Sequence, residues 1–265
     1  MPDMTYETLL VEERDGITTI TVNRPDALNA LNATVLAELD AVTTAIAGAR
    51  ATARGVILTG AGDKAFIAGA DIKAMSQMTP DQAESFGRLG QGVTAQLESL
   101  PVPVVACVNG FALGGGCEMA MASDFIYATG SARFGQPEVS LGLIPGFGGC
   151  VRLIRYVGPG RAKELIYTGR HIKAEEAARL GLVNNVFETK DEMLAVAAAT
   201  LGEIATRSPT AVALAKSVIN ATHGLSTAAA LDAEAVAFRG TFSTNDMREG
   251  TTAFLEKRPP AFTGD

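Results

Sequence analysis

The chain is poor in several residue types, and each shortage excludes a class of protein. It has no tryptophan and only two histidines, His171 and His223, both in polar surroundings and away from any G-x-S-x-G elbow. A Ser-His-Asp hydrolase is therefore poorly supported, and so is a metal site built on histidine. The sequence also lacks a G-x-x-x-x-G-K-[ST] loop, so nothing in it is typical of a P-loop nucleotide site.

Cysteines and long apolar runs are equally scarce. Cys107, Cys117 and Cys150 lie in apolar surroundings without C-x-x-C spacing, which predicts three buried thiols and neither a disulfide nor a metal site. No apolar run approaches the roughly 18 residues that a membrane span needs. The acidic, strand-like beginning over residues 1–15 resembles neither a signal peptide nor a transit peptide. We therefore expect a cytoplasmic protein.

Basic residues are too few for a nucleic-acid surface to be the main function. The net charge is −7 and the pI is near 5.0, so a polyanionic ligand would need a local basic patch. Apolar residues make up 47% of the chain and charged residues 19%, which is typical of a soluble protein with a sizeable core. The 28 glycines indicate many tight turns and close backbone approaches.

Short apolar strands alternate with helical patterns along the first two-thirds of the chain. Strands are predicted over residues 6–11, 16–22, 55–59, 103–110, 124–128, 133–135 and 183–187. Helices are predicted over residues 32–50, 79–100, 116–123, 146–158, 158–168 and 173–180. The stretch 60–73 reads as a loop, and a glycine-rich turn precedes the helix at 116. This alternation predicts an α/β core.

From Lys190 onward the chain reads as helical throughout and is rich in alanine. The predicted organisation is therefore a core over residues 1–190 and a helical region over residues 191–265. The helical region could dock on its own core or on a neighbouring subunit, and the sequence leaves both open.

Two glutamates stand out as candidates for chemistry. Glu118 ends the segment FALGGGCE and Glu138 ends the segment FGQPE. A carboxylate in such apolar surroundings is expensive to bury, so it is usually hydrogen-bonded or has a raised pKa. A pair of such acids suits general acid/base work. The structural alternative is that both are acids at helix starts or on the surface.

Two loops of small residues lie near these acids in the sequence. They are AGADIK at 68–73 and LGGGCE at 113–118, the second of which ends at Glu118 itself. Their backbone N–H groups can approach a ligand, and the second loop opens a helix whose positive end favours negative charge. One donor from each loop would form an oxyanion hole. Tight strand-to-helix turns are the structural alternative for either loop alone. The segment GAGDKA at 60–65 matches a dinucleotide fingerprint, but no helix opening follows it, so we set it aside.

Six segments in register resemble the enoyl-CoA hydratase (crotonase) family, and they span essentially the whole chain. They are NRPDALNAL at 23–31, AFIAGADIK at 65–73, NGFALGGGCE at 109–118, FGQPEV at 134–139, LIPGFGG at 143–149 and AFLEKR at 253–258. The short-chain hydratases of the family are the most similar.

The resemblance implies a crotonase-like spiral of strand-strand-helix repeats, with a C-terminal helical region that forms a trimer or a hexamer of two stacked trimers. By similarity, the N–H groups of Ala70 and Gly115 form the oxyanion hole, and Glu118 and Glu138 flank a water molecule. The implied reaction is hydration of a short-chain 2-enoyl-CoA, with Glu118 activating the water and Glu138 delivering a proton to C2. No metal or separate cofactor is expected, because coenzyme A is part of the substrate.

Contacts to coenzyme A are also carried over by similarity. The expected substrate-binding residues are Ala27, Leu28, Lys64, Ala68, Asp71, Ile72, Lys73 and Lys257, the last reaching a neighbouring subunit's substrate. Asp26 stands where family members often carry a lysine, which puts one phosphate contact in doubt. Each lysine has the alternative of being a plain solvated charge.

Two further functions stay open. Family members with one carboxylate, at the position of Glu138, tend to be enoyl-CoA isomerases. A non-catalytic RNA-binding or scaffold homologue is the alternative from another class, and it would need a basic stripe that the charge balance does not offer.

Overall fold

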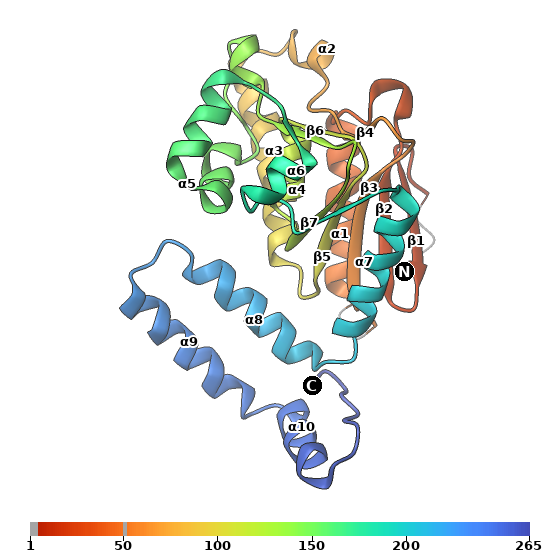
Figure 1. The fold of residues 1–265 in the computed structure, drawn as a ribbon, viewed down its shortest axis with the longest axis vertical. Coiled ribbons are helices and arrows are strands. Elements are labelled where there is room, and N and C mark those ends of the chain that lie inside the picture. Colours follow the sequence, from red (N-terminus) through yellow and green to blue (C-terminus); the bar gives the residue numbers. More distant parts are fainter. Residues whose placement is uncertain (1–4, 50–51) are drawn as a thin grey trace.

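Two sheets of unequal size organise the first two-thirds of the chain in the computed structural model, which describes residues 5–49 and 52–265 (Figure 1). The larger sheet has the order β1 (Leu9–Arg14), β2 (Ile17–Val22), β3 (Gly55–Gly60), β5 (Val104–Val108), β7 (Phe125–Thr129) and β10 (Asn185–Phe187). The smaller sheet has the order β4 (Ala65–Ile67), β6 (Phe111–Leu113), β8 (Arg133–Gly135) and β9 (Ile172–Lys173). Only the β1–β2 and β8–β9 pairs of these sheets are antiparallel.

The chain winds through both sheets in a repeated path. Each turn contributes a strand to the larger sheet, a strand to the smaller sheet and then a helix. The helices of the successive turns are α2 (Ile72–Met75) with α3 (Pro80–Ser99), then α4 (Gly115–Met121), then the 3-10 helix η2 (Glu138–Leu141) with α5 (Gly149–Thr168). The predicted spiral of strand-strand-helix repeats is confirmed.

Helices cover both faces of the larger sheet, as parallel strands require. On one face, α1 (Ala33–Gly48) and α3 pack together and contribute to the main core, into which α1 buries Leu36, Leu39 and Val42. On the other face, α7 (Lys190–Ile204) places Met193, Ala197 and Leu201 in a second, smaller core against strand residues. The six residues of β3 and the five of β5 are consequently all buried.

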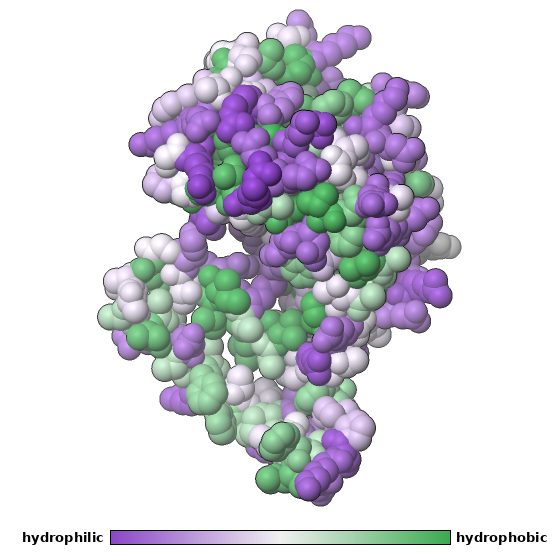
Figure 2. Space-filling model, in the orientation of Figure 1, coloured by the Kyte–Doolittle hydropathy of each residue, from purple (hydrophilic) through white to green (hydrophobic). Residues whose placement is uncertain are grey.

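The last three helices leave the sheets. They are α8 (Pro209–Thr222), α9 (Thr227–Thr241) and α10 (Asn245–Glu256), and α9 and α10 extend away from the spiral (Figure 1). Lys216 of α8 attaches this region to the core, because its Nζ lies 2.8 Å from Asp124 Oδ2 and donates to two backbone carbonyls. Apolar side chains gather over these helices (Figure 2). Those more than half exposed are Ile219, Leu231, Val236, Phe238, Phe242, Phe254 and Leu255.

Several predictions from the sequence are wrong in detail. The stretch 60–73 is not a simple loop, since it contains β4 and the start of α2, and the predicted glycine-rich turn contains β6. These strands have three residues each, too few for a periodic pattern. The helix predicted to end at Arg50 ends at Gly48, and Arg50 itself lies outside the described residues. The chain does not stay helical to its end, because α10 stops at Glu256.

The thiol prediction is also partly wrong. Cys107 and Cys117 are buried, but Cys150 is exposed, because it stands in the first turn of α5 on the outward side of that helix. The remaining elements are η1 (Pro25–Ala27) and α6 (Ala174–Arg179). No helix within the described ranges is long and apolar enough to cross a membrane.

Candidate active site

A cavity of about 590 Å³ lies where the three turns of the spiral meet. Its floor comes from the loops before α2 and α4, and both Glu118 and Glu138 line it. The first half of α3 and the segment between η2 and α5 cover its other sides, with mostly apolar residues. A largely apolar pocket with a few convergent polar groups is the usual form of a small-molecule site.

Ala70 and Gly115 both line this cavity, as the oxyanion-hole hypothesis needs. Ala70 forms a parallel bridge with Leu31 in which Gly69 O and the Asp71 N–H make the hydrogen bonds, so the N–H of Ala70 points away from Leu31. Gly115 is the first residue of α4, and the first helical bond runs from the Glu118 N–H to Gly114 O. The N–H of Gly115 therefore has no acceptor inside the helix.

Gly116 is the residue that lets these two loops meet. A Cβ added there would lie 1.9 Å from Ile67 O, so α4 approaches the end of β4 more closely than any side chain would permit. The glycine therefore sets the spacing of the two candidate donors.

Glu118 is 1% exposed and is held by backbone donors from a distant segment. Its Oε1 accepts from the Phe147 N–H at 2.8 Å and from the Gly149 N–H at 2.6 Å. Burial raises the pKa of this carboxyl to about 7, and the charge of Glu138 adds to the rise. The two N–H groups and the Arg152 charge oppose it. The acid is thus poised to exchange a proton near neutral pH.

Glu138 opens η2 on the other side of the cavity and is only partly buried. Burial raises the pKa of its carboxyl, while its own backbone N–H lowers it. The side-chain amide of Gln136, in the orientation that satisfies both groups, donates to Oε1 at 3.0 Å and to Oε2 at 3.2 Å. Glu138 therefore has its own set of donors, separate from those of Glu118.

The residues expected to bind coenzyme A fall into two groups. Ala68 and Ile72 line the cavity, and the Ala68 N–H donates to Leu28 O, which brings the segment of Ala27 and Leu28 to the same rim. Asp71 faces inward to the protein instead: its Oδ1 caps α2 and its Oδ2 lies 3.3 Å from Arg24. Asp71 therefore has a structural role, as the cap of α2 and the partner of Arg24.

The lysines of that set lie apart from the cavity wall. Lys64 and Lys73 are exposed on either side of the 68–71 loop and do not line the cavity. Lys257 is the C-cap of α10, a helix that extends away from the spiral (Figure 1), and it does not line the cavity. Any role of Lys257 in this site would require a second subunit.

Three contributors were missed at the level of sequence: the N–H donors of Phe147 and Gly149, the Gln136 amide, and Arg152. The two N–H donors could have been predicted in part, because the segment LIPGFGG at 143–149 leads into a helix and the first N–H groups of a helix have no acceptor inside it. Among the described residues, no group of three or more His, Cys, Asp or Glu side chains could hold a metal ion.

Fold and site together show an α/β spiral in which two carboxylates and two small-residue loops line one cavity. The chain belongs to the enoyl-CoA hydratase/isomerase family, whose model matches residues 12–265. A protein of Clostridium acetobutylicum named short-chain-enoyl-CoA hydratase is 48% identical, with 96% of this chain and 97% of that protein covered. A crotonyl-CoA hydratase of Syntrophomonas wolfei is 46% identical, with 98% and 99% covered. The crystal structure of an enoyl-CoA hydratase from Bacillus anthracis superposes with a TM-score of 0.93 at 41% identity, covering 98% of this chain and all of that one.

Proposed function

We propose that this protein is an enoyl-CoA hydratase that reversibly adds water to short-chain trans-2-enoyl-CoA and gives 3-hydroxyacyl-CoA. Family membership and the names of its relatives support the reaction class. The observation that carries the assignment of residues is that two carboxylates with raised pKa values line one cavity with two backbone donors.

The chemistry follows from the electronic structure of the substrate. A 2-enoyl thioester becomes electrophilic at C3 only when its carbonyl oxygen can accept charge. The N–H groups of Ala70 and Gly115 stabilise that developing enolate, at about 10²–10³ in rate for such a donor. Because they belong to fixed backbone, they need no reorganisation during the reaction.

Each acid has one proton transfer to perform. Glu118 takes a proton from the water as its oxygen bonds to C3, and the C2=C3 electron pair moves toward the thioester. Glu138 then gives its proton to C2. The cycle ends with Glu118 protonated and Glu138 ionised, and a proton passing between them restores the starting state. Each transfer contributes about 10²–10⁴ in rate, and the two acids titrate as a coupled pair.

A chain-length series tests this function directly. Loss of the conjugated-enoyl absorbance is followed with crotonyl-CoA and with longer 2-enoyl-CoA substrates, for the wild type and for Glu118→Gln and Glu138→Gln. Each variant should lower kcat by about 10²–10⁴, while binding of the acyl-CoA persists. Unchanged hydration in both variants would refute the roles of the acids. The presence of the second acid, Glu118, disfavours the isomerase alternative, which would gain weight if Glu118→Gln still isomerised a 3-enoyl-CoA.

The oligomer and the location belong to the same proposal. The exposed apolar side chains of α8–α10 support assembly into a trimer or a hexamer through the helical region. In such an assembly Lys257 reaches the substrate of a neighbouring subunit, while Lys64 and Lys73 serve the phosphates in their own. The reaction requires no cofactor beyond the coenzyme A of the substrate, and we assign the protein to the cytoplasm.

A further inference from the structure

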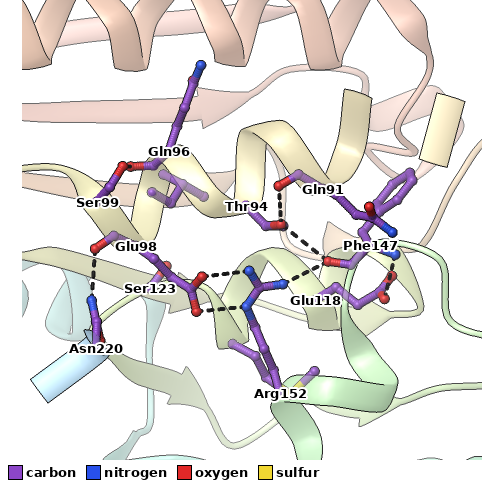
Figure 3. Close-up of polar contacts among 12 residues, drawn as sticks. Gln91, Thr94, Gln96, Glu98, Ser99, Glu118, Ser123, Phe147, Arg152 and Asn220 are labelled. Carbon is purple, nitrogen blue, oxygen red and sulfur yellow. Dashed lines mark hydrogen bonds and ion pairs between the residues drawn. The ribbon is translucent and has the colours of Figure 1, made fainter. Parts of the chain in front are cut away.

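We propose that Arg152 of α5 is a positioning residue that holds Glu118 in place through the backbone of Phe147; this inference rests on the proposed function. Figure 3 shows the Arg152 guanidinium between Glu98 and Phe147, with the carboxylate of Glu118 beside the Phe147 N–H. Arg152 Nη1 donates to Phe147 O at 2.8 Å, and the N–H of the same Phe147 donates to Glu118 Oε1 at 2.8 Å. One residue therefore connects the cation to the acid by its two backbone polar groups.

Glu98 of α3 fixes the orientation of this arginine. Arg152 Nε donates to Glu98 Oε1 at 2.8 Å and Nη2 donates to Oε2 at 2.7 Å, with the two side chains 11% and 28% exposed. This paired contact uses one edge of the planar guanidinium and leaves Nη1 directed at Phe147 O. A lysine ammonium is a single point and does not match this geometry.

Further contacts hold the same loop from α3. The buried Thr94 donates its hydroxyl to Phe147 O at 3.2 Å, and Gln91 Nε2 donates to Gly146 O at 2.9 Å. Asn220 of α8 donates to Glu98 O at 2.9 Å, so the helical region also meets this network. The carbonyl groups of the 146–149 loop are thus held by Gln91, Thr94 and Arg152, while its N–H groups donate to Glu118.

Arg152 also acts on Glu118 by charge. The titratable groups that face Glu118 are Glu138, Cys150 and Arg152, with Cys117 beside it on α4 and Glu84 and Arg88 across the cavity. Of the charges that affect the pKa of Glu118, Glu138 raises it and Arg152 lowers it. Loss of Arg152, or of the N–H bonds that it maintains, therefore raises the pKa of Glu118 further.

The experiment compares Arg152→Met and Arg152→Lys with Arg155→Met. Arg155 is the matched control because its Nη1 lies 3.9 Å from the same Glu98 carboxylate, while its side chain is 38% exposed and, among the described residues, no hydrogen bond joins it to Phe147. For Arg152→Met we expect kcat to fall about 10–100-fold, as for a small misplacement of a reacting group. KM should change by less than about threefold, and the acid limb of the pH profile should move to higher pH.

Arg152→Lys should return the acid limb toward its wild-type position, because the charge is kept, while kcat stays below wild type. Arg155→Met should match the wild type in both readouts. The inference is overturned if folded Arg152→Met keeps the wild-type kcat and pH profile, or if Arg155→Met produces the same shift. If Arg152→Met does not fold, Arg152→Lys and the near-isosteric Thr94→Val test the inference in its place. Thr94→Val should show a smaller fall in kcat with the acid limb moved the same way, and wild-type behaviour of both overturns the inference.

A readout without catalysis separates this inference from the proposed function. The infrared band of the protonated Glu118 carboxyl, assigned by its loss in Glu118→Gln, reports the pKa of that acid directly. A protein that hydrates no enoyl thioester refutes the proposed function. The inference about Arg152 still stands if the band titrates at higher pH in Arg152→Met than in the wild type, and it fails if the titration is unchanged.

Discussion

The carboxylate of Glu138 lies directly against Gly114, so that a Cβ at position 114 would come within 2.6 Å of Glu138 Oε1. Gly114 also has φ 47°, in the left-handed region that favours glycine. The residue before Gly115, the candidate oxyanion donor of α4, therefore also determines where the second acid can stand.

Gly114→Ala should consequently displace Glu138 and strain the backbone. We expect kcat for crotonyl-CoA to fall at least about tenfold and the free energy of unfolding to fall by about 1–3 kcal/mol. Gly92→Ala, on α3 and outside the cavity wall, is the control, because a Cβ there has nothing within 4 Å and its φ is not positive. Hydration rates and urea denaturation check both. Wild-type activity in Gly114→Ala would contradict the close placement of Glu138.

Activity should require ionised Glu118 and should fall as the pH drops below about 7, where burial has placed the pKa of this acid. Glu138 must carry the proton that it delivers, so activity should also fall at high pH, where this acid ionises and its charge raises the pKa of Glu118. The residual activity of Glu138→Gln should lack this alkaline limb. The pH profile of kcat/KM measures both limbs. An alkaline limb at the same pH in the two proteins would show that Glu138 is not the acid that protonates C2.

Glu118 should reduce stability at neutral and alkaline pH. Its pKa is about 7 in the folded chain against an ordinary value of 4.5. The folded state therefore binds this proton more tightly than the unfolded state. The resulting stability is fully present below pH 4.5 and is lost as the pH rises through 7. Glu118→Gln should thus be more stable than the wild type above pH 7 by up to about 3 kcal/mol.

Urea denaturation at one protein concentration, above pH 7 and near pH 4.5, measures this difference. The gain should shrink toward the lower pH. Glu12→Gln, on the exposed edge strand β1, is the control for the loss of one carboxylate. A stability difference that is constant with pH would contradict the burial of an ionisable Glu118.

The acyl end of the cavity should be limited by two rings. Phe86 of α3 and Phe147 both line the cavity and pack edge to face, with centroids 5.4 Å apart. Phe86→Ala should lengthen the preferred acyl chain, raising kcat/KM for longer 2-enoyl-CoA relative to crotonyl-CoA by about tenfold. Val93→Ala, in the core on the same helix but outside the cavity wall, should lower stability without this change. An unchanged chain-length preference in Phe86→Ala would place the acyl end elsewhere.

The exposed lysines beside the 68–71 loop should act on binding alone. Lys64→Ala and Lys73→Ala should each raise KM about two- to fivefold with kcat unchanged, as for loss of one screened charge contact. The effect should weaken as salt is added. Lys163→Ala, an exposed lysine of α5 outside the cavity wall, is the control. If all three variants kept the wild-type KM, Lys64 and Lys73 would be plain solvated charges with no part in binding.

Much of the fold could be predicted from local pattern. The alternation of short apolar strands and helices predicted the α/β core, because burial repeats with the period of each element, whereas the spiral was implied by the family resemblance. The three-residue strands β4 and β6 were not predicted. Their stability comes from the pairing of β4 with β6 and of β6 with β8, and not from a pattern in their own residues. The exposure of Cys150 escaped for a similar reason, because an apolar neighbourhood in sequence does not fix which side of α5 faces the core.

The sequence alone determined which groups are available: two acids in apolar segments and two small-residue loops, one of which opens a helix. Only the tertiary structure decided how they are held. The donors to Glu118 come from residues 29 and 31 positions away, and the carboxylate that orients Arg152 lies 54 positions from it. Residue types and their spacing are local properties of a chain. The approach of distant backbones depends on packing, as at Gly116, where the absence of one side chain lets α4 reach β4.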